Sequence, residues 1–186
     1  MDIFDVITSR RSIKKFTDRT ISNEAIGQML SMAVMAPNHR MTEPWRFYVL
    51  GPEARAAYGA ALGARKAKRV EDPDAAREVV AKVEATHRDL PAMLAVSMTR
   101  HENPEILEED YAATYMAIQN LSLAACAMGL GTHVKSGAVM DDPNARAAVG
   151  VGEDERIVAT ISLGEPAEEP APKARRDASE LTTWVP

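Results

Sequence analysis

The longest stretch of helical periodicity in this 186-residue chain covers residues 106–128. Its second half, 116–128, is apolar nearly all round, and the polar exceptions are Gln119, Asn120 and Ser122. A helix of this kind is buried on most of its surface. We therefore predict that it forms the centre of the core, either within one chain or shared with a second subunit.

Periodicity and capping residues predict the other helices, and runs rich in branched or aromatic residues predict the strands. The predicted helices are 2–9, 22–35, 53–70, 74–87 and 141–149. The predicted strands are 45–50, 92–98, 132–135 and 156–163. From Gly164 onward, prolines and charges predict an extended arm, 164–186, in place of a core element. This order predicts one α+β domain, 1–186, with a small central sheet covered by helices.

Composition excludes several classes of protein. Hydrophobic residues make up 46% of the chain and charged residues 26%, which is typical of a soluble globular protein. The net charge of −5 argues against a nucleic-acid partner, and no apolar run is long enough to span a membrane. The single cysteine, Cys126, allows no disulfide framework and no zinc-ligand spacing, so we expect a reducing, cytoplasmic location.

A dense group of cations and hydroxyls lies near the N-terminus, in residues 8–16. In an extended chain Arg10, Ser12 and Lys14 point to the same side. An arginine beside a serine suits a phosphate, because the guanidinium forms a bidentate clamp and the hydroxyl adds a neutral hydrogen bond. The alternative interpretation is a solvated basic turn.

Common catalytic motifs are absent from the sequence. It contains no Gly-x-Gly-x-x-Gly, no Gly-x-x-x-x-Gly-Lys and no His-Glu-x-x-His. No serine or cysteine stands out as a nucleophile, and Cys126 is more typical of a small core residue.

A second basic run is predicted to be an exposed helix face; it comprises Arg65, Lys66, Lys68 and Arg69.

Four stretches, in this order, resemble the FMN-dependent nitroreductase family, and the short length is similar to its small members. The first two are RRSIKKF at 10–16 and APNHRMTEPWRF at 36–47. The third is QNL at 119–121 with GLG at 129–131, and the last is ISLGEP at 161–166 with KARR at 173–176. Each match is weak alone, whereas four in sequence are specific.

The resemblance implies a domain-swapped homodimer with two FMN sites at the interface, each built from both subunits. The long central helices would pack across the two-fold axis, and the arm 164–186 would wrap the partner.

The resemblance also assigns roles to residues of the basic segment. Arg10 and Ser12 match the family's phosphate and ribityl contacts, and Arg175 matches its late phosphate arginine. Lys14 matches a basic residue beside the pyrimidine edge of the flavin ring, where a cation stabilises the anionic reduced flavin. Arg11 lies between two residues that match flavin contacts, so its backbone, more than its side chain, is expected to be used in binding.

Two further segments are assigned in the same way. Asn38 and His39 match positions that reach the flavin from the other subunit. Val134, Lys135 and Ser136 match a segment that passes the flavin ring, where a backbone amide can serve N5.

The chain departs from the family pattern at a few positions. Many members have Asn where Met41 stands and Gln where Glu43 stands, and this version of the loop is similar to the reductive dehalogenase branch of the fold. Lys173 and Arg176 remain alternatives to Arg175 for the late phosphate contact.

The function implied is a ping-pong oxidoreductase. NADH or NADPH would give a hydride to flavin N5 and leave, and an electron-poor small molecule such as a nitroaromatic or quinone would then be reduced. Alternatives are a same-fold flavin dehydrogenase or reductive dehalogenase, a non-catalytic FMN-binding or storage protein, and an interaction domain without cofactor. The sequence does not distinguish NADH from NADPH, since it carries no acidic ribose-binding fingerprint.

Overall fold

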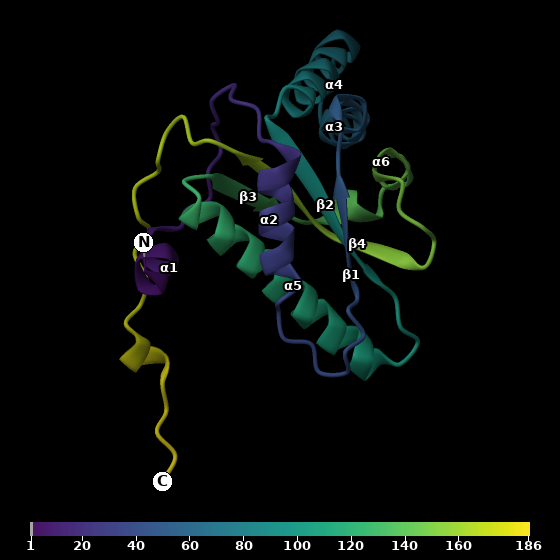
Figure 1. The fold of residues 1–186 in the computed structure, drawn as a ribbon. Coiled ribbons are helices and arrows are strands. Elements are labelled where there is room, and N and C mark those ends of the chain that lie inside the picture. Colours follow the sequence, from purple (N-terminus) through teal and green to yellow (C-terminus); the bar gives the residue numbers. More distant parts are fainter. Residues whose placement is uncertain (1) are drawn as a thin grey trace.

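The computed structural model describes residues 2–186, which fold around one antiparallel sheet (Figure 1). Its strands are β1 (Trp45–Val49), β2 (Ala92–Thr99), β3 (Gly131–Lys135) and β4 (Glu155–Gly164). They lie in the order β1-β2-β4-β3. In this register Ile161 of β4 pairs with Leu94 on one side and with Val134 on the other. The predicted α+β class, with a small sheet covered by helices, is confirmed.

Helices α2 (Asn23–Ala33) and α5 (Pro104–Ala127) cover one face of the sheet (Figure 1). Successive residues of a strand point to opposite faces, so every second residue of β2 and β4 packs under these helices. The largest fully buried ones are Leu94, Val96, Met98, Ile161 and Leu163.

The other face is covered by α3 (Pro52–Ala67), α6 (Pro143–Val149) and a short 3-10 helix, η1 (Ala138–Asp141). Tyr58 of α3 is 1% exposed and packs in a cluster with Met93 and Ile157. Helix α4 (Pro73–Arg88) packs against α3. A β-carbon on Gly59 would lie 2.9 Å from Cα of Glu84, so this glycine allows the two helices to approach closely.

The predicted helices are present, with differences at their ends. Ser22 is the N-cap of α2, as expected, and its hydroxyl accepts a hydrogen bond from Ala25 N–H at 3.2 Å. The single helix predicted at 141–149 is wrong at its start. Asp142 follows η1 as its C-cap and is also the N-cap of α6, because its side chain accepts a hydrogen bond from Asn144 N–H. Pro143 occupies the first turn of α6, where a backbone N–H would have no partner within the helix, so proline is tolerated there.

Helix α5 is less buried than its composition predicts. Ala117, Leu121 and Ala125 are at most 1% exposed, but Met116 is 40% and Met128 is 39% exposed. The prediction that 116–128 is buried on most sides is therefore wrong for a single chain. The sheet, α2 and α1 leave part of this helix uncovered, and Met116 and Met128 lie on that open part.

The basic segment follows α1 (Ile3–Ser9) and lies along the edge of β3. Ile13 N–H donates to Thr132 O at 2.9 Å, and Ser12 forms a parallel bridge with Thr132. Ile13 is buried at 3% exposure, while Ser12 and Lys14 on either side of it are exposed. The alternation expected from the sequence is therefore present, with the apolar residue inside and the polar residues outside.

The chain beyond β4 is extended, apart from a 3-10 turn, η2 (Ala178–Leu181), that Asp177 caps. In Figure 1 this arm passes α1, and its C-terminal end projects away from the body. Trp184 is 91% and Val185 is 84% exposed. None of the helices formed by residues 2–186 combines the length and the apolar character needed to cross a bilayer.

Candidate functional site

The basic segment and the arm together form the walls of one cleft, with a volume of about 580 Å³. The N-terminal wall contributes the end of α1 and the residues that follow it. The residues lining the cleft are Ile7, Thr8, Arg10, Arg11, Ser12, Lys14, Lys15, Glu168, Pro170, Ala171, Pro172, Lys173 and Arg175. Five sequence-predicted residues, Arg10, Arg11, Ser12, Lys14 and Arg175, are thus brought together. Arg176 is not part of the lining.

Most cations in this cleft lack acidic partners within the described residues. Arg10, Lys14, Lys173 and Arg175 form no ion pair with any acid in residues 2–186. The one carboxylate in the lining, Glu168, is held by Lys15 Nζ at 2.6 Å. In a chain with a net charge of −5, unpaired cations that converge on a cleft indicate an anion-binding site.

Polar contacts between the segment and the arm fix the shape of the cleft. Thr17 N–H donates to Glu165 O at 2.9 Å, and Ala167 N–H donates to Lys15 O at 3.1 Å. The Glu165 carboxylate also accepts from the Thr17 hydroxyl and from Arg19 Nη1, both at 2.9 Å. These hydrogen bonds hold the pKa of Glu165 below its ordinary value. The start of the arm is therefore hydrogen-bonded to the end of the basic segment.

Arg11 differs from its neighbours in the cleft. Its Nη1 donates to Thr8 O at 2.6 Å and to Arg10 O at 3.0 Å, so the guanidinium binds carbonyls at the C-terminal end of α1. A cation is favourable there because the last carbonyls of a helix lack partners within the helix.

The segment 134–136 lies on β3 and just beyond it, outside this cleft. Val134 packs against the core under α5. Lys135 points to the opposite face, where Nζ donates to Ser162 Oγ at 3.3 Å. Burial, reinforced by the charge of Lys66, lowers the pKa of Lys135. Ser136 is exposed and borders a second hollow, below α3.

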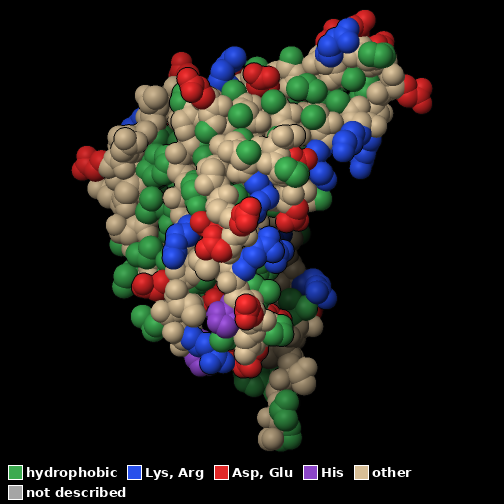
Figure 2. Space-filling view, turned by 90° about the vertical axis from the view of Figure 1, so that its right-hand side faces the viewer, with side chains coloured by type: hydrophobic (Ala, Val, Ile, Leu, Met, Phe, Trp, Pro, Cys, Tyr) green, Lys and Arg blue, Asp and Glu red, His purple; other side chains and the backbone are tan. Residues whose placement is uncertain are grey.

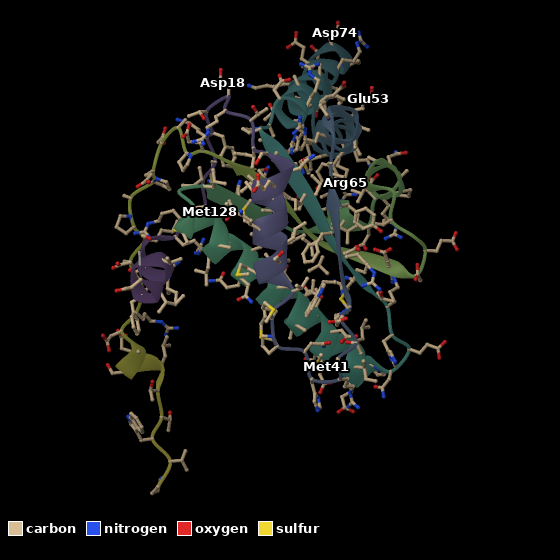
Figure 3. All side chains as sticks on the ribbon, in the orientation of Figure 1. Asp18, Met41, Glu53, Arg65, Asp74 and Met128 are labelled. Atoms are coloured by element: carbon tan, nitrogen blue, oxygen red, sulfur yellow. The ribbon has the colours of Figure 1, made fainter. Side chains whose placement is uncertain are left out.

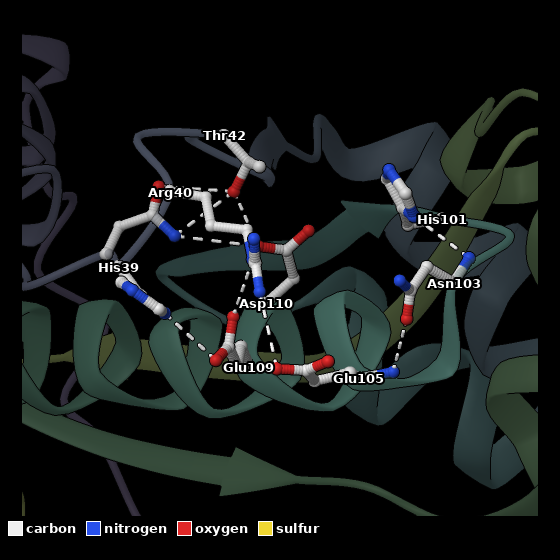
Figure 4. Close-up of polar contacts among 9 residues, drawn as sticks. His39, Arg40, Thr42, His101, Asn103, Glu105, Glu109 and Asp110 are labelled. Carbon is white, nitrogen blue, oxygen red and sulfur yellow. Dashed lines mark hydrogen bonds and ion pairs between the residues drawn. The ribbon is translucent and has the colours of Figure 1, made fainter.

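Within one chain, Asn38 and His39 line neither hollow. His39 lies against the N-terminal half of α5 (Figure 4), and Asn38 Nδ2 donates to Asp110 Oδ1 of the same helix at 3.5 Å. His39 Nδ1 lies 2.9 Å from Glu109 Oε1, and Arg40 Nε donates to the other oxygen of Glu109 at 3.1 Å. These contacts lower the pKa of Glu109, with the His39 hydrogen bond as the largest cause.

The loop that carries Asn38 is held in an unusual backbone conformation. Met41 and Glu43 have φ angles of 50° and 44°, the left-handed region that non-glycine residues rarely adopt. Asn38 Oδ1 accepts from Glu43 N–H at 2.7 Å, and the Thr42 hydroxyl donates to Asp110 of α5. Asp110 is 3% exposed. Sequence reasoning missed this anchor, because one carboxylate among the acids of a helix carries no local signal.

The second hollow has a volume of about 470 Å³ and combines the end of α3 with the chain after β3. It contains the basic run that the sequence predicted as a helix face. The lining residues are Leu62, Arg65, Lys66, Lys68, Arg69, Ser136, Gly137, Ala138 and Val139.

Comparison with known proteins agrees with this architecture. The chain is 38% identical over 171 residues to the Bacillus subtilis protein named "Putative NAD(P)H nitroreductase YfhC", covering 92% of this chain and 88% of that one. The crystal structure of a nitroreductase-like family protein from Bacillus cereus is 28% identical, with a TM-score of 0.86 over 100% of this chain and 96% of that one.

A third structure is similar in fold. It is the FMN and NADPH-dependent nitroreductase NfnB from Sphigopyxis sp. strain HMH, 20% identical, with a TM-score of 0.80 and full coverage of both chains. The model of the nitroreductase family matches residues 7–165, most of the 186-residue chain. On these grounds the chain belongs to the nitroreductase family.

Proposed function

We propose that this protein is an FMN-dependent oxidoreductase that takes electrons from NAD(P)H and reduces an electron-poor small molecule, such as a nitroaromatic or a quinone. The observation that carries the proposal is the cleft in which Arg10, Lys14 and Arg175 converge without acidic partners. The name of the NfnB nitroreductase, which includes both FMN and NADPH, supports the same assignment.

The residues of the cleft fit the phosphate end of FMN. A phosphomonoester carries about two negative charges at neutral pH, and two guanidinium groups match that charge. Arg10 and Arg175 would hold the phosphate from opposite walls, and the Ser12 hydroxyl would add a neutral hydrogen bond. Lys14, two residues further along the same side of the chain, would place its ammonium beside the ring.

The redox chemistry would be supplied by bound FMN, which would carry electrons from NAD(P)H to the acceptor. The chain itself binds and orients the ligands. Lys14 would stabilise negative charge on the reduced flavin, and the backbone of 134–136 would offer amide groups to it. The sequence supplies no evident nucleophile, which agrees with a protein that acts through position and electrostatics.

We further propose that the working unit is a homodimer with a site at each end of the interface. Large apolar side chains stay exposed on one chain, including Phe4 at 75%, Trp184 at 91% and Met116 at 40%. Exposed apolar surface of this extent is typical of an interface. In the dimer, Asn38 and His39 would reach the partner's flavin, and the arm would lie against the partner.

Two experiments test this proposal. Steady-state rates measured against both NAD(P)H and a quinone should give parallel double-reciprocal lines, as ping-pong kinetics requires; intersecting lines, or no turnover at all, would contradict it.

For the dimer, subunits carrying Arg10→Gln should be mixed with subunits carrying Asn38→Ala after partial unfolding and refolding. Mixed dimers contain one intact site, so activity should recover above that of either variant alone; a lack of recovery would argue against shared sites.

A further inference from the structure

The hollow below α3 collects positive charge that the FMN site does not use. Arg65, Lys66, Lys68 and Arg69 all line it. Arg65 lies between α3 and α6 (Figure 3), where its Nη1 is 3.6 Å from the carboxylate of Asp142. The other three form no ion pair with an acid in the described part of the chain, residues 2–186.

The surface view agrees with this arrangement. Lys and Arg side chains gather on the underside of the upper lobe, which contains α3 and α4, above a concave part of the surface (Figure 2). Among residues 2–186, none of those that line the hollow is acidic. The charge of Lys66 also reaches inward, since it contributes to the lowered pKa of Lys135 on the adjacent strand. The hollow is therefore a region of positive potential.

The opposite wall of the hollow belongs to the proposed flavin segment. Ser136 and Gly137 follow β3 directly, and both line the hollow. Gly137 has a φ angle of 126°, a conformation that side chains rarely adopt, and a β-carbon there would meet nothing within 4 Å. No side chain covers the backbone at Gly137. A ligand that lies over the 134–136 segment can therefore continue toward the cations at the end of α3 and just beyond it.

We infer that this hollow binds the 2′-phosphate of NADPH and so makes NADPH the preferred electron donor over NADH. The inference rests on the proposed oxidoreductase function, because a donor must first lie over the flavin. NADPH differs from NADH by one phosphomonoester with about two negative charges. Lys66, Lys68 and Arg69 supply matching charge, and the Ser136 hydroxyl is an additional hydrogen-bond donor.

A purely structural role for the same cations is the competing explanation. Arg65 and Lys66 lie in the last turn of α3, where a cation interacts favourably with the helix dipole. That role would stabilise the helix and would not distinguish between the two donors. The experiment must therefore separate effects on stability from effects on the 2′-phosphate.

The test compares two double variants of the FMN-loaded protein that remove the same charges. Lys68→Gln with Arg69→Gln alters the hollow, whereas Lys82→Gln with Arg77→Gln alters exposed positions of α4 outside it. Binding of adenosine 2′,5′-bisphosphate and of adenosine 5′-monophosphate is measured by calorimetry. Anaerobic stopped-flow spectroscopy then gives the dependence of flavin reduction on NADPH and on NADH.

We expect the hollow variant to bind the 2′,5′-bisphosphate about tenfold more weakly and to lose about tenfold of its preference for NADPH, since several exposed charges act together. The α4 variant should differ from the parent by less than about twofold. Equal weakening for NADPH and NADH, or no discrimination between the two nucleotides by the parent protein, would overturn the inference.

Failure of the inference is distinguishable from failure of the proposed function. If both donors reduce the flavin equally well in every variant, the oxidoreductase assignment stands and the phosphate site is wrong. If the protein takes up no FMN, the proposed function fails. In that case the calorimetric comparison still decides whether the hollow recognises a 2′-phosphate, because it does not depend on turnover.

Discussion

The side chain of Ile13 occupies the space that a β-carbon on Gly131 would need. The added atom would lie 2.3 Å from Cγ1 and 2.7 Å from Cβ of Ile13. Gly131 begins β3 directly after the turn that ends α5, and Ile13 lies at the centre of the basic segment. This contact therefore sets how closely the segment approaches the sheet, and with it the positions of Arg10 and Lys14.

The first prediction concerns this contact. Gly131→Ala should lower the free energy of unfolding by about 1–3 kcal/mol, because the buried Ile13 has no room to move aside. FMN affinity should also fall, since the segment is pushed away from β3. Urea unfolding and fluorescence titration with FMN measure the two effects.

Gly27→Ala is the control: no atom lies within 4 Å of its added β-carbon, so it should stabilise α2 by about 0.5–1 kcal/mol. Unchanged stability in Gly131→Ala would contradict the close packing.

The second prediction distinguishes between neighbouring arginines of the arm. Arg175 lines the cleft and Arg176 does not. Loss of a charge-assisted hydrogen bond to a phosphate costs about 1.5–3 kcal/mol, so Arg175→Gln should weaken FMN binding by about 10-fold to 100-fold. Arg176→Gln removes the same charge one residue away and should change the FMN dissociation constant by less than about twofold. Equal effects would mean that the arm acts only through its net charge.

The third prediction concerns the buried carboxylate beneath the strained loop. Asp110→Ala leaves the Thr42 hydroxyl and the Asn38 amide without their partner on α5. It should therefore cost about 1–3 kcal/mol of stability. The exposed pair between Glu105 and Arg40 provides the comparison, and Glu105→Gln should cost less than about 1 kcal/mol. Thermal unfolding measures both, and the loop is not anchored as described if the two variants lose the same stability.

The fourth prediction is a pH dependence of stability. His87 is 5% exposed, and burial lowers its pKa below the ordinary value of 6.5. Below pH 6.5 the unfolded chain binds a proton that the folded chain does not, so the free energy of unfolding falls as the pH decreases toward the folded pKa.

The variant His87→Phe keeps a ring against Tyr58, whose centroid is 5.8 Å away, and removes the titrating group. Urea unfolding at several pH values between about 7.5 and 5.5 should therefore show a shallower slope for this variant, across the range in which a histidine titrates. Burial also lowers the pKa of His133, so part of the slope should remain. A slope equal to that of the unmodified protein would show that His87 is not the group responsible.

Local patterns in the sequence were sufficient for some parts of the site. The alternation of Arg10, Ser12 and Lys14 around a buried Ile13 follows from the two-residue period of an extended chain. The strands and the α+β class follow from periodicity in the same way. These features depend on neighbours within a few residues, and the sequence contains them directly.

Other parts depend on contacts between distant segments. Arg175 joins Arg10 only because the arm pairs with residues 15–17 through Glu165 and Ala167. The basic run was predicted to be an exposed helix face. Lys66, Lys68 and Arg69 are exposed, but α3 ends at Ala67, so Lys68 and Arg69 follow the helix. Their position beside Ser136 could not be foreseen. The periodicity of hydrophobic residues in the sequence does not indicate that the loop after β3 lies beside the end of α3.

An anaerobic absorption titration of the purified protein, with NADPH first and a nitroaromatic or quinone second, is the decisive test of the oxidoreductase function. We expect a yellow protein whose flavin band bleaches on addition of NADPH and returns when the acceptor is added. A yellow protein that NADPH and NADH both fail to bleach would contradict the oxidoreductase function and favour FMN storage. A colourless protein that does not take up added FMN would contradict the assignment of the cleft formed by Arg10, Lys14 and Arg175.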